Sequence, residues 1–141
     1  MKKVSTVLFT LSLTLLFGYA GCSYYPSLSN PPTIANLVYY PLKTPVNPGG
    51  LITATGSIDF FKKTGDIASV TSVTYDAQGK QIAESSIPVS GTADETVGTL
   101  AIAVDFGISG KGRYTFQVYV TDSKGAQSNR VTGSFEVTDL F

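Results

Sequence analysis

Apolar and polar residues alternate with a period of two in three successive segments of the C-terminal half of the chain. Every second position except Gly133 carries valine, isoleucine, leucine or an aromatic ring, and the positions between carry mainly threonine, alanine, serine or a charged residue. Successive side chains of a β-strand point to opposite faces, so this pattern predicts strands with one buried face. The three segments are residues 99–106, 114–121 and 131–137.

Four earlier segments carry the same pattern less regularly. Residues 34–40 and 51–60 are predicted strands, the second with clear alternation. In residues 67–75, Val70 and Val73 have an odd spacing, which predicts either a bulge near Thr71 and Ser72 or a strand covered on both faces. Residues 81–89 form a poor strand, and Pro88, which cannot donate a ladder hydrogen bond, places it at the edge of a sheet.

The connections between these segments carry turn-forming residues. An Asp-x-x-Gly sequence occurs twice, at Asp76 to Gly79 and at Asp122 to Gly125. In both, the aspartate can bond to the backbone that follows it, and the glycine can take a positive φ. No long window has helical periodicity. Seven short strands with polar outer faces predict an all-β fold, a sandwich of two packed sheets.

The first twenty-two residues follow a different pattern. Lys2 and Lys3 precede a short apolar stretch at residues 7–17, and small residues close the segment at Gly18, Ala20 and Gly21. This is the layout of a secretory signal peptide. The alternative is a retained membrane-spanning helix, which prefers about 20 apolar residues, more than this stretch contains.

The end of this segment, Tyr19-Ala20-Gly21-Cys22, resembles the lipobox of bacterial lipoproteins, with Tyr19 where leucine is usual. The resemblance implies cleavage between Gly21 and Cys22, acylation of Cys22, and attachment to the membrane through that lipid. In that family, a serine directly after the lipidated cysteine, as at Ser23 here, favours the outer membrane over the inner membrane of the bacterial envelope. An incidental cysteine after an ordinary cleavage site is the other interpretation of this residue.

The chain therefore divides into residues 1–21 as a lipoprotein signal peptide, residues 22–32 as a lipidated cysteine with an extended tether, and residues 33–141 as one domain. The tether is rich in proline and serine and has no charge. Such a composition favours an extended chain. Tyr24 and Tyr25 can lie at the lipid headgroups or dock on the domain.

The predicted hairpin from Gly112 to Ser128 resembles the last hairpin of bacterial immunoglobulin-like domains, including the PKD, cadherin-like and fibronectin type III groups. The shared residues include Tyr114, alternating apolar residues up to Val120, and the Asp122 turn. The resemblance implies a seven-stranded immunoglobulin-like β-sandwich with a tyrosine corner at Tyr114. The antibody Cys-Trp-Cys pattern and the PKD hallmark Trp-x-Phe-Gly-Asp are both missing.

Composition and charge exclude several functions. The chain has ten basic and ten acidic residues, and loss of the two signal lysines leaves a net charge of −2. Lys62-Lys63, the one basic pair of the mature chain, is predicted to be a solvated loop, and no basic block favours nucleic acid as a partner. With no histidine, the chain lacks a Ser-His-Asp or Cys-His catalytic set and histidine metal sites. We expect no enzymatic activity, no cofactor and no small-molecule ligand.

Two binding sites remain as weaker alternatives. Asp59 and Asp66, near Gly65, offer carboxylates for calcium, although calcium prefers six to eight oxygen ligands and two lysines lie between these acids. Glycan binding would use exposed aromatic faces. The candidate rings are Tyr24, Tyr25, Tyr39, Tyr40 and Tyr119.

Together these observations predict a non-enzymatic, lipid-anchored protein of the cell envelope. Its immunoglobulin-like domain would bind another protein or support an assembly, and exposed strand edges would permit strand addition. A glycan- or calcium-binding surface module is the alternative.

Overall fold

The computed structural model describes residues 30–45 and 49–139, so the predicted signal peptide, Cys22 and most of the tether lie outside the described residues. Within these ranges the secondary structure is all β, and no helix is long and apolar enough to cross a membrane. The strands are β1 (Thr33–Tyr40), β2 (Lys43–Pro45), β3 (Leu51–Phe61), β4 (Ile67–Tyr75), β5 (Gln81–Pro88), β6 (Val97–Gly107), β7 (Gly112–Asp122) and β8 (Val131–Thr138).

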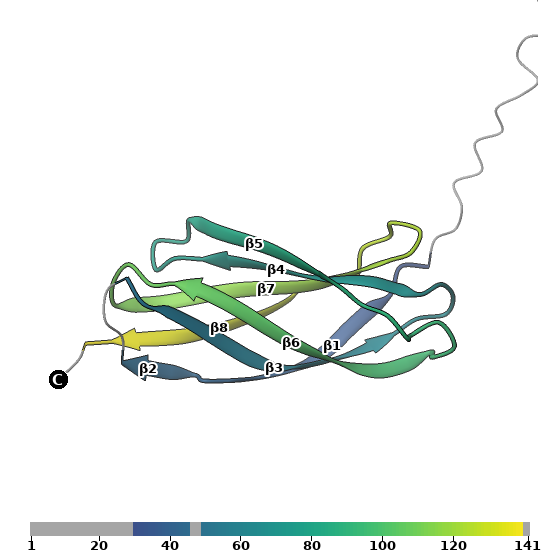
Figure 1. The fold of residues 1–141 in the computed structure, drawn as a ribbon, viewed down its shortest axis with the longest axis horizontal. Helices are drawn as coiled ribbons and strands as arrows, with labels where there is room; N and C mark the ends of the chain where they lie inside the picture. The colour runs from purple at the N-terminus through teal and green to yellow at the C-terminus, as the bar shows by residue number, and fades with distance from the viewer. Residues whose placement is uncertain (1–29, 46–48, 140–141) are drawn as a thin grey trace, which may run out of the picture.

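The strands form two sheets that pack face to face along the long axis of the domain (Figure 1). The first sheet has the order β1-β3-β6, and the second has the order β2-β8-β7-β4-β5. All neighbours are antiparallel except β2 and β8, which run parallel. β6 and β8 end at the same end of the long axis (Figure 1).

Each of the seven predicted strands is confirmed, but the count of seven is wrong because the structure has an eighth strand. This is β2, which the sequence pattern did not predict, and it ends at Pro45. Lys43, Thr44 and Pro45 pair with the last residues of β8 at the edge of the five-stranded sheet. An edge position tolerates the proline, because one side of such a strand needs no ladder bond.

Aromatic rings fill the centre of the space between the sheets. The Phe106 ring lies edge-on to Phe135, with 4.4 Å between ring centroids, and edge-on to Phe116 at 5.7 Å. Tyr114, on β7, stacks on Phe135. These side chains come from alternating positions of β6, β7 and β8, which are the three segments with the clearest period-two pattern.

The structure has no bulge at Thr71 and Ser72, where the sequence predicted one. The alternative prediction, a strand covered on both faces, is confirmed. The β4 pairings shift instead at residues 67–69 and 74–75. The five residues from Val70 to Thr74 are all buried. β4 lies between β5 and β7, and side chains of the neighbouring strands flank its outward residues, as where the Thr71 hydroxyl bonds to the Ser86 hydroxyl of β5.

Both predicted aspartate turns are confirmed. Asp76 Oδ1 accepts hydrogen bonds from the backbone N–H groups of residues 78 and 80, and Asp122 Oδ1 accepts from those of residues 124 and 126. The tyrosine corner is also confirmed. The Tyr114 hydroxyl donates to the Gly110 carbonyl at 3.0 Å, and Tyr114 is only 1% exposed.

Candidate binding groove at the open side of the sandwich

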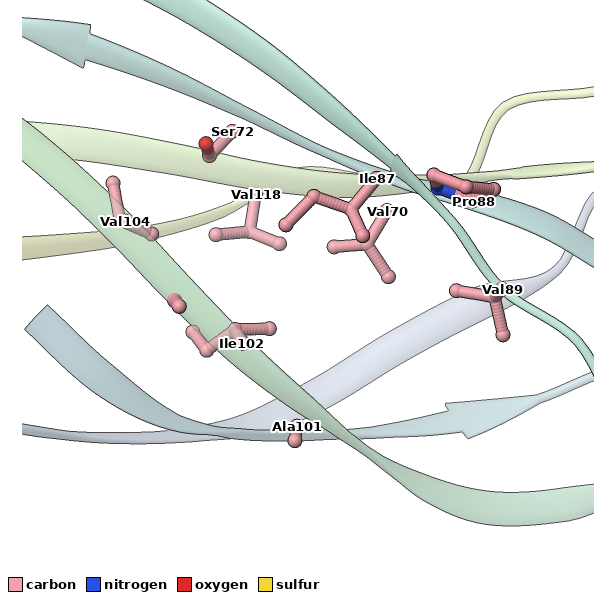
Figure 2. Close-up of a pocket in the computed structure, with 10 residues that line it drawn as sticks. Val70, Ser72, Ile87, Pro88, Val89, Ala101, Ile102, Val104 and Val118 are labelled. Carbon is pink, nitrogen blue, oxygen red and sulfur yellow. The ribbon is translucent and has the colours of Figure 1, made fainter.

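The two sheets leave an apolar groove on the side formed by β5 and β6. Each of these strands is the last of its own sheet. The groove has a volume of about 220 Å³. Figure 2 shows Ile87, Val70 and Val118 of the five-stranded sheet on one side and Ile102 and Val104 of β6 across the gap. The complete lining is Val70, Ser72, Ile87, Pro88, Val89, Ala101, Ile102, Ala103, Val104 and Val118.

The chemistry of this groove favours an uncharged occupant. None of its lining residues carries a charge, and Ser72 supplies the one side-chain hydroxyl. A charged group entering such a lining would lose its hydration and find no ionic partner. Small-molecule pockets usually measure about 300–1,000 Å³ and contain a few convergent polar groups. The groove therefore suits aliphatic side chains more than a polar small molecule.

The edge of β5 carries several features that discourage a further strand. Pro88 lacks a backbone N–H and stands at the end of the strand, which confirms its predicted place at a sheet edge. The pairing of β5 with β4 shifts at Ile82, where the strand has an extra residue. Glu84 adds a charge to the middle of this exposed strand. Proline, bulges and charged side chains are the common means by which proteins protect sheet edges.

The edge of β6 lacks these features. β6 pairs with β3 through eleven successive residue pairs without a register shift. From Leu100 to Val104 the strand contains no charge and no proline. Asp105, just beyond this run, is turned toward β3, because its carboxylate accepts a hydrogen bond from the Thr53 hydroxyl at 2.6 Å. Within the described ranges, the outer edge of β6 thus remains without a partner strand or a protective side chain.

The opposite side of the sandwich is closed by side chains that bond to backbone groups. The Asn129 amide accepts from Ile34 N and donates to Ile34 O, both at 2.9 Å. The Tyr39 hydroxyl donates to Ser134 O at 2.6 Å and accepts from Ser134 N at 2.7 Å. We call these four bonds the clasp. The chain also crosses here from β1 to β2, through the cis Tyr40–Pro41 peptide bond.

The two carboxylates of the calcium alternative lie in different surroundings. Asp59, on the outer face of β3, accepts hydrogen bonds from Asn36 Nδ2 at 2.9 Å and Thr99 Oγ1 at 2.7 Å. These bonds, first that of Asn36, hold the pKa of the Asp59 carboxyl below its ordinary value. Asp66 accepts a hydrogen bond from the Thr92 hydroxyl. The described residues contain no group of three acidic or sulfur ligands, so calcium binding stays a prediction without a preformed site.

The prediction that Lys62 is solvated is wrong. Lys62 is 7% exposed, and its ammonium group donates to the carbonyls of Gly65 at 2.5 Å and Ala93 at 3.2 Å. Its side chain therefore joins the loop after β3 to the loop before β6. A lysine that bonds to loop carbonyls has no sequence signal that distinguishes it from the solvated Lys63 beside it.

The tyrosines considered for glycan binding separate into distinct environments. Tyr39 packs edge-on against Phe116 and belongs to the clasp, so its ring faces the core. Tyr119 is buried, with the Arg130 guanidinium 4.5 Å from its ring centroid. Tyr40 is 75% exposed and offers a free face, while Tyr24 and Tyr25 lie outside the described residues. The structure does not bring these rings into one surface.

The groove itself was not predicted from the sequence. Its β6 side has a signal that can be recognised in retrospect, namely the uncharged run from Leu100 to Val104 in an unbroken strand. Its β5 side has none, because Ile87 and Val89 belong to the least regular of the predicted strands. The arrangement of the two sheets, which leaves β5 and β6 facing each other, decides the site.

The fold defines the class of the domain, an immunoglobulin-like β-sandwich. No protein-family model matches the chain, and no curated protein matches it. Among solved structures, the PKD domain of an M14-like peptidase from Thermoplasmatales archaeon SCGC AB-540-F20 is 15% identical, with a TM-score of 0.46 over 78% of this chain and 98% of that one. The CARDB domain of a Pyrococcus furiosus protein, in complex with di-metal ions, is 10% identical, with a TM-score of 0.45 over 77% and 94%.

Proposed function

We propose that this chain is a non-enzymatic, lipid-anchored protein of the bacterial cell envelope whose immunoglobulin-like domain binds another protein. The observation that carries the binding role is the uncharged groove beside the unprotected edge of β6. Grooves and free edges of this kind are the features that extended polypeptides use for docking. On the opposite side, the clasp joins β1 to Ser134 of β8 and to Asn129 just before it, and no such bonds join β5 to β6 within the described residues.

The anchor is the second part of the proposal. Cys22 is the one cysteine of the chain and follows Tyr19-Ala20-Gly21. Stable anchoring without a membrane-spanning helix requires more than one acyl chain, since a single chain binds only marginally. A diacylated Cys22 meets this requirement, and Ser23 favours the outer membrane as the location.

Mass spectrometry of the mature protein tests the anchor. We expect the mature chain to begin at Cys22 with the mass of its acyl chains added, and a Cys22→Ser variant to leave the membrane fraction. A mature chain that begins elsewhere, or an unmodified Cys22, would contradict the proposal.

Purification of the tagged acylated chain from native membranes tests the binding role. We expect one other protein to co-purify in a fixed ratio after mild cross-linking. A chain that runs as a monomer under every extraction condition would count against this role.

A further inference from the structure

We infer that the edge of β6 accepts an extended strand from a partner protein, which pairs with β6 and places alternate apolar side chains in the groove. This inference rests on the proposed function and names the mode of binding. The three-stranded sheet ends at β6, and the next strand position along its edge is unfilled by the described residues.

The choice of β6 over β5 follows from the features of the two edges. β5 has a proline at its end, a register shift at Ile82 and a charge at Glu84. β6 has an unbroken ladder with β3 and an uncharged run from Leu100 to Val104. A strand adds most readily to an edge that is regular and lacks charge and proline.

The lining of the groove determines the chemistry of the incoming strand. Inward positions of such a strand would stand beside Ile102 and Val104 and face Ile87 across the groove. The matching partner residues are aliphatic and uncharged, since no lining residue can pair with a charge. Outward positions would stand beside Ala101 and Ala103, which leave room for polar side chains. The partner is thus an extended segment of about five residues with apolar residues at every second position.

A second copy of this chain fits the groove less well. Its own unprotected edge, within the residues described, is β6. The inward side chains of β6, Ile102 and Val104, are 6% and 1% exposed and already belong to the core of their own domain. Pairing β6 with β6 would satisfy backbone groups but would leave both grooves unfilled. A segment that is not part of another folded core can supply both backbone and side chains.

A photo-cross-linking experiment in cells tests this inference. The acylated full-length chain would carry p-benzoylphenylalanine in place of Ala103 on β6 or, as the matched control, Ala83 on β5. We expect an adduct from position 103 at least tenfold stronger than from position 83. The peptide joined at position 103 should come from a different protein and carry uncharged apolar residues at alternate positions. An Ile87→Lys change, at a residue 48% exposed, should reduce this adduct at least tenfold.

The contrary outcomes separate the inference from the proposed function. A partner that co-purifies with the Ile87→Lys chain as well as with the unchanged chain would overturn strand addition but leave protein binding intact. Equal adducts from positions 83 and 103 would overturn the preference for β6. An adduct with a second copy, or with the N-terminal segment of the same chain, would overturn the assignment of the occupant. The absence of any partner or adduct would contradict both proposals.

A self-complemented variant provides a second test that needs no partner. A flexible linker and the segment Thr-Val-Ser-Val-Thr-Val-Ser would be added after Phe141, because β8 and β6 end at the same end of the domain (Figure 1). We expect the melting temperature of the acylated chain to rise by about 5 °C or more, and the cross-link at position 103 to be lost. The control has the same composition in the order Val-Val-Val-Thr-Thr-Ser-Ser. An equal response to both segments, or to neither, would overturn the inference.

Discussion

The side of the sandwich formed by β1 and β8 is joined by the clasp, whereas across the side formed by β5 and β6 the described residues place no hydrogen bond. On the closed side, Asn129 and Tyr39 supply the donors and acceptors that a neighbouring strand would supply. On the open side, aliphatic side chains line a groove and backbone edges remain available. Unpaired strand edges invite association with other chains. The difference is that side chains close one side of the sandwich, whereas the other side keeps an unpaired strand edge beside an apolar groove.

The closed side also depends on a close approach of two backbones, and its disruption is our largest expected effect. Gly56 on β3 pairs with Tyr39 on β1. A Cβ added at Gly56 would collide with the Val38 carbonyl oxygen and lie 2.7 Å from Tyr39 Cα. Because both contacts are with backbone, β1 must move, and Tyr39 would leave Ser134. We expect Gly56→Ala to lower the free energy of unfolding by about 3 kcal/mol.

Thermal unfolding followed by circular dichroism would measure this change, with an expected fall in melting temperature of about 12 °C. The matched control is Gly107→Ala in the same sheet, where an added Cβ has no neighbour within 4 Å. A melting temperature that falls equally in both variants, or in neither, would contradict the role of the close approach.

The Asn129 half of the clasp gives the next effect in size. An Asn129→Ala change removes both bonds to the backbone of Ile34, a residue 3% exposed. Leaving a buried backbone group without a partner costs about 1–3 kcal/mol, so we expect a loss near 2 kcal/mol. Urea unfolding would measure it. Gln127→Ala, in the same connection, should change the stability by less than about 0.5 kcal/mol. Comparable losses in the two variants would show that the Asn129 bonds are unimportant.

Two neighbouring tyrosines allow a finer test of the closed side. Tyr39→Phe removes the hydroxyl that bonds to Ser134 but keeps the ring, which lies 4.9 Å from Phe116 between centroids. We expect a loss of about 1 kcal/mol. Tyr40→Phe removes the hydroxyl of an exposed ring and should leave the urea midpoint unchanged. If Tyr39→Phe is also neutral, the hydroxyl does not contribute to the closure.

The sequence was sufficient for the strands but not for the difference between the two sides. Period two along each segment depends on one buried face, which is a local property, and it located all seven of the expected strands. The Tyr114 corner and the Asp76 and Asp122 turns were also predictable, because each involves residues close in the sequence. These features depend on short-range backbone bonding, which residue type and spacing already constrain.

What the sequence did not predict depends on contacts between distant segments. Asn129 and Ile34 are 95 residues apart, as are Tyr39 and Ser134, and no local pattern relates them. β2 has three residues and includes Pro45, so its pairing with β8 depends on the tertiary fold. Prediction of the groove likewise requires knowledge of which sheet β5 joins. Single-sequence patterns fix the faces of strands but not the order of strands in their sheets.

The smallest expected effect concerns a polar row that crosses the outer face of the three-stranded sheet from the closed side to the open side. Asp59 on β3 accepts hydrogen bonds from Asn36 on β1 and Thr99 on β6. These bonds favour the ionised carboxyl and lower its pKa below the ordinary value of 3.8. A lowered pKa in the folded state stabilises the protein fully above the unfolded pKa. This contribution is lost as the pH falls from about 3.8 through the folded pKa.

As the pH falls from 5 to 2, the free energy of unfolding of an Asp59→Asn variant should therefore fall less than that of the unchanged chain, because the asparagine side chain does not titrate. Unfolding by urea across this range would measure the difference, and a carboxyl titration by NMR would locate the Asp59 pKa directly. Asp94→Asn, at a position where the described residues place no side-chain hydrogen bond, is the control and should keep the original pH dependence. Since the Asp59 side chain is partly exposed, solvent screens the row, and we expect its contribution to stability to be small. An Asp59 pKa at or above 3.8 would mean that the hydrogen bonds of the row do not favour the ionised carboxyl.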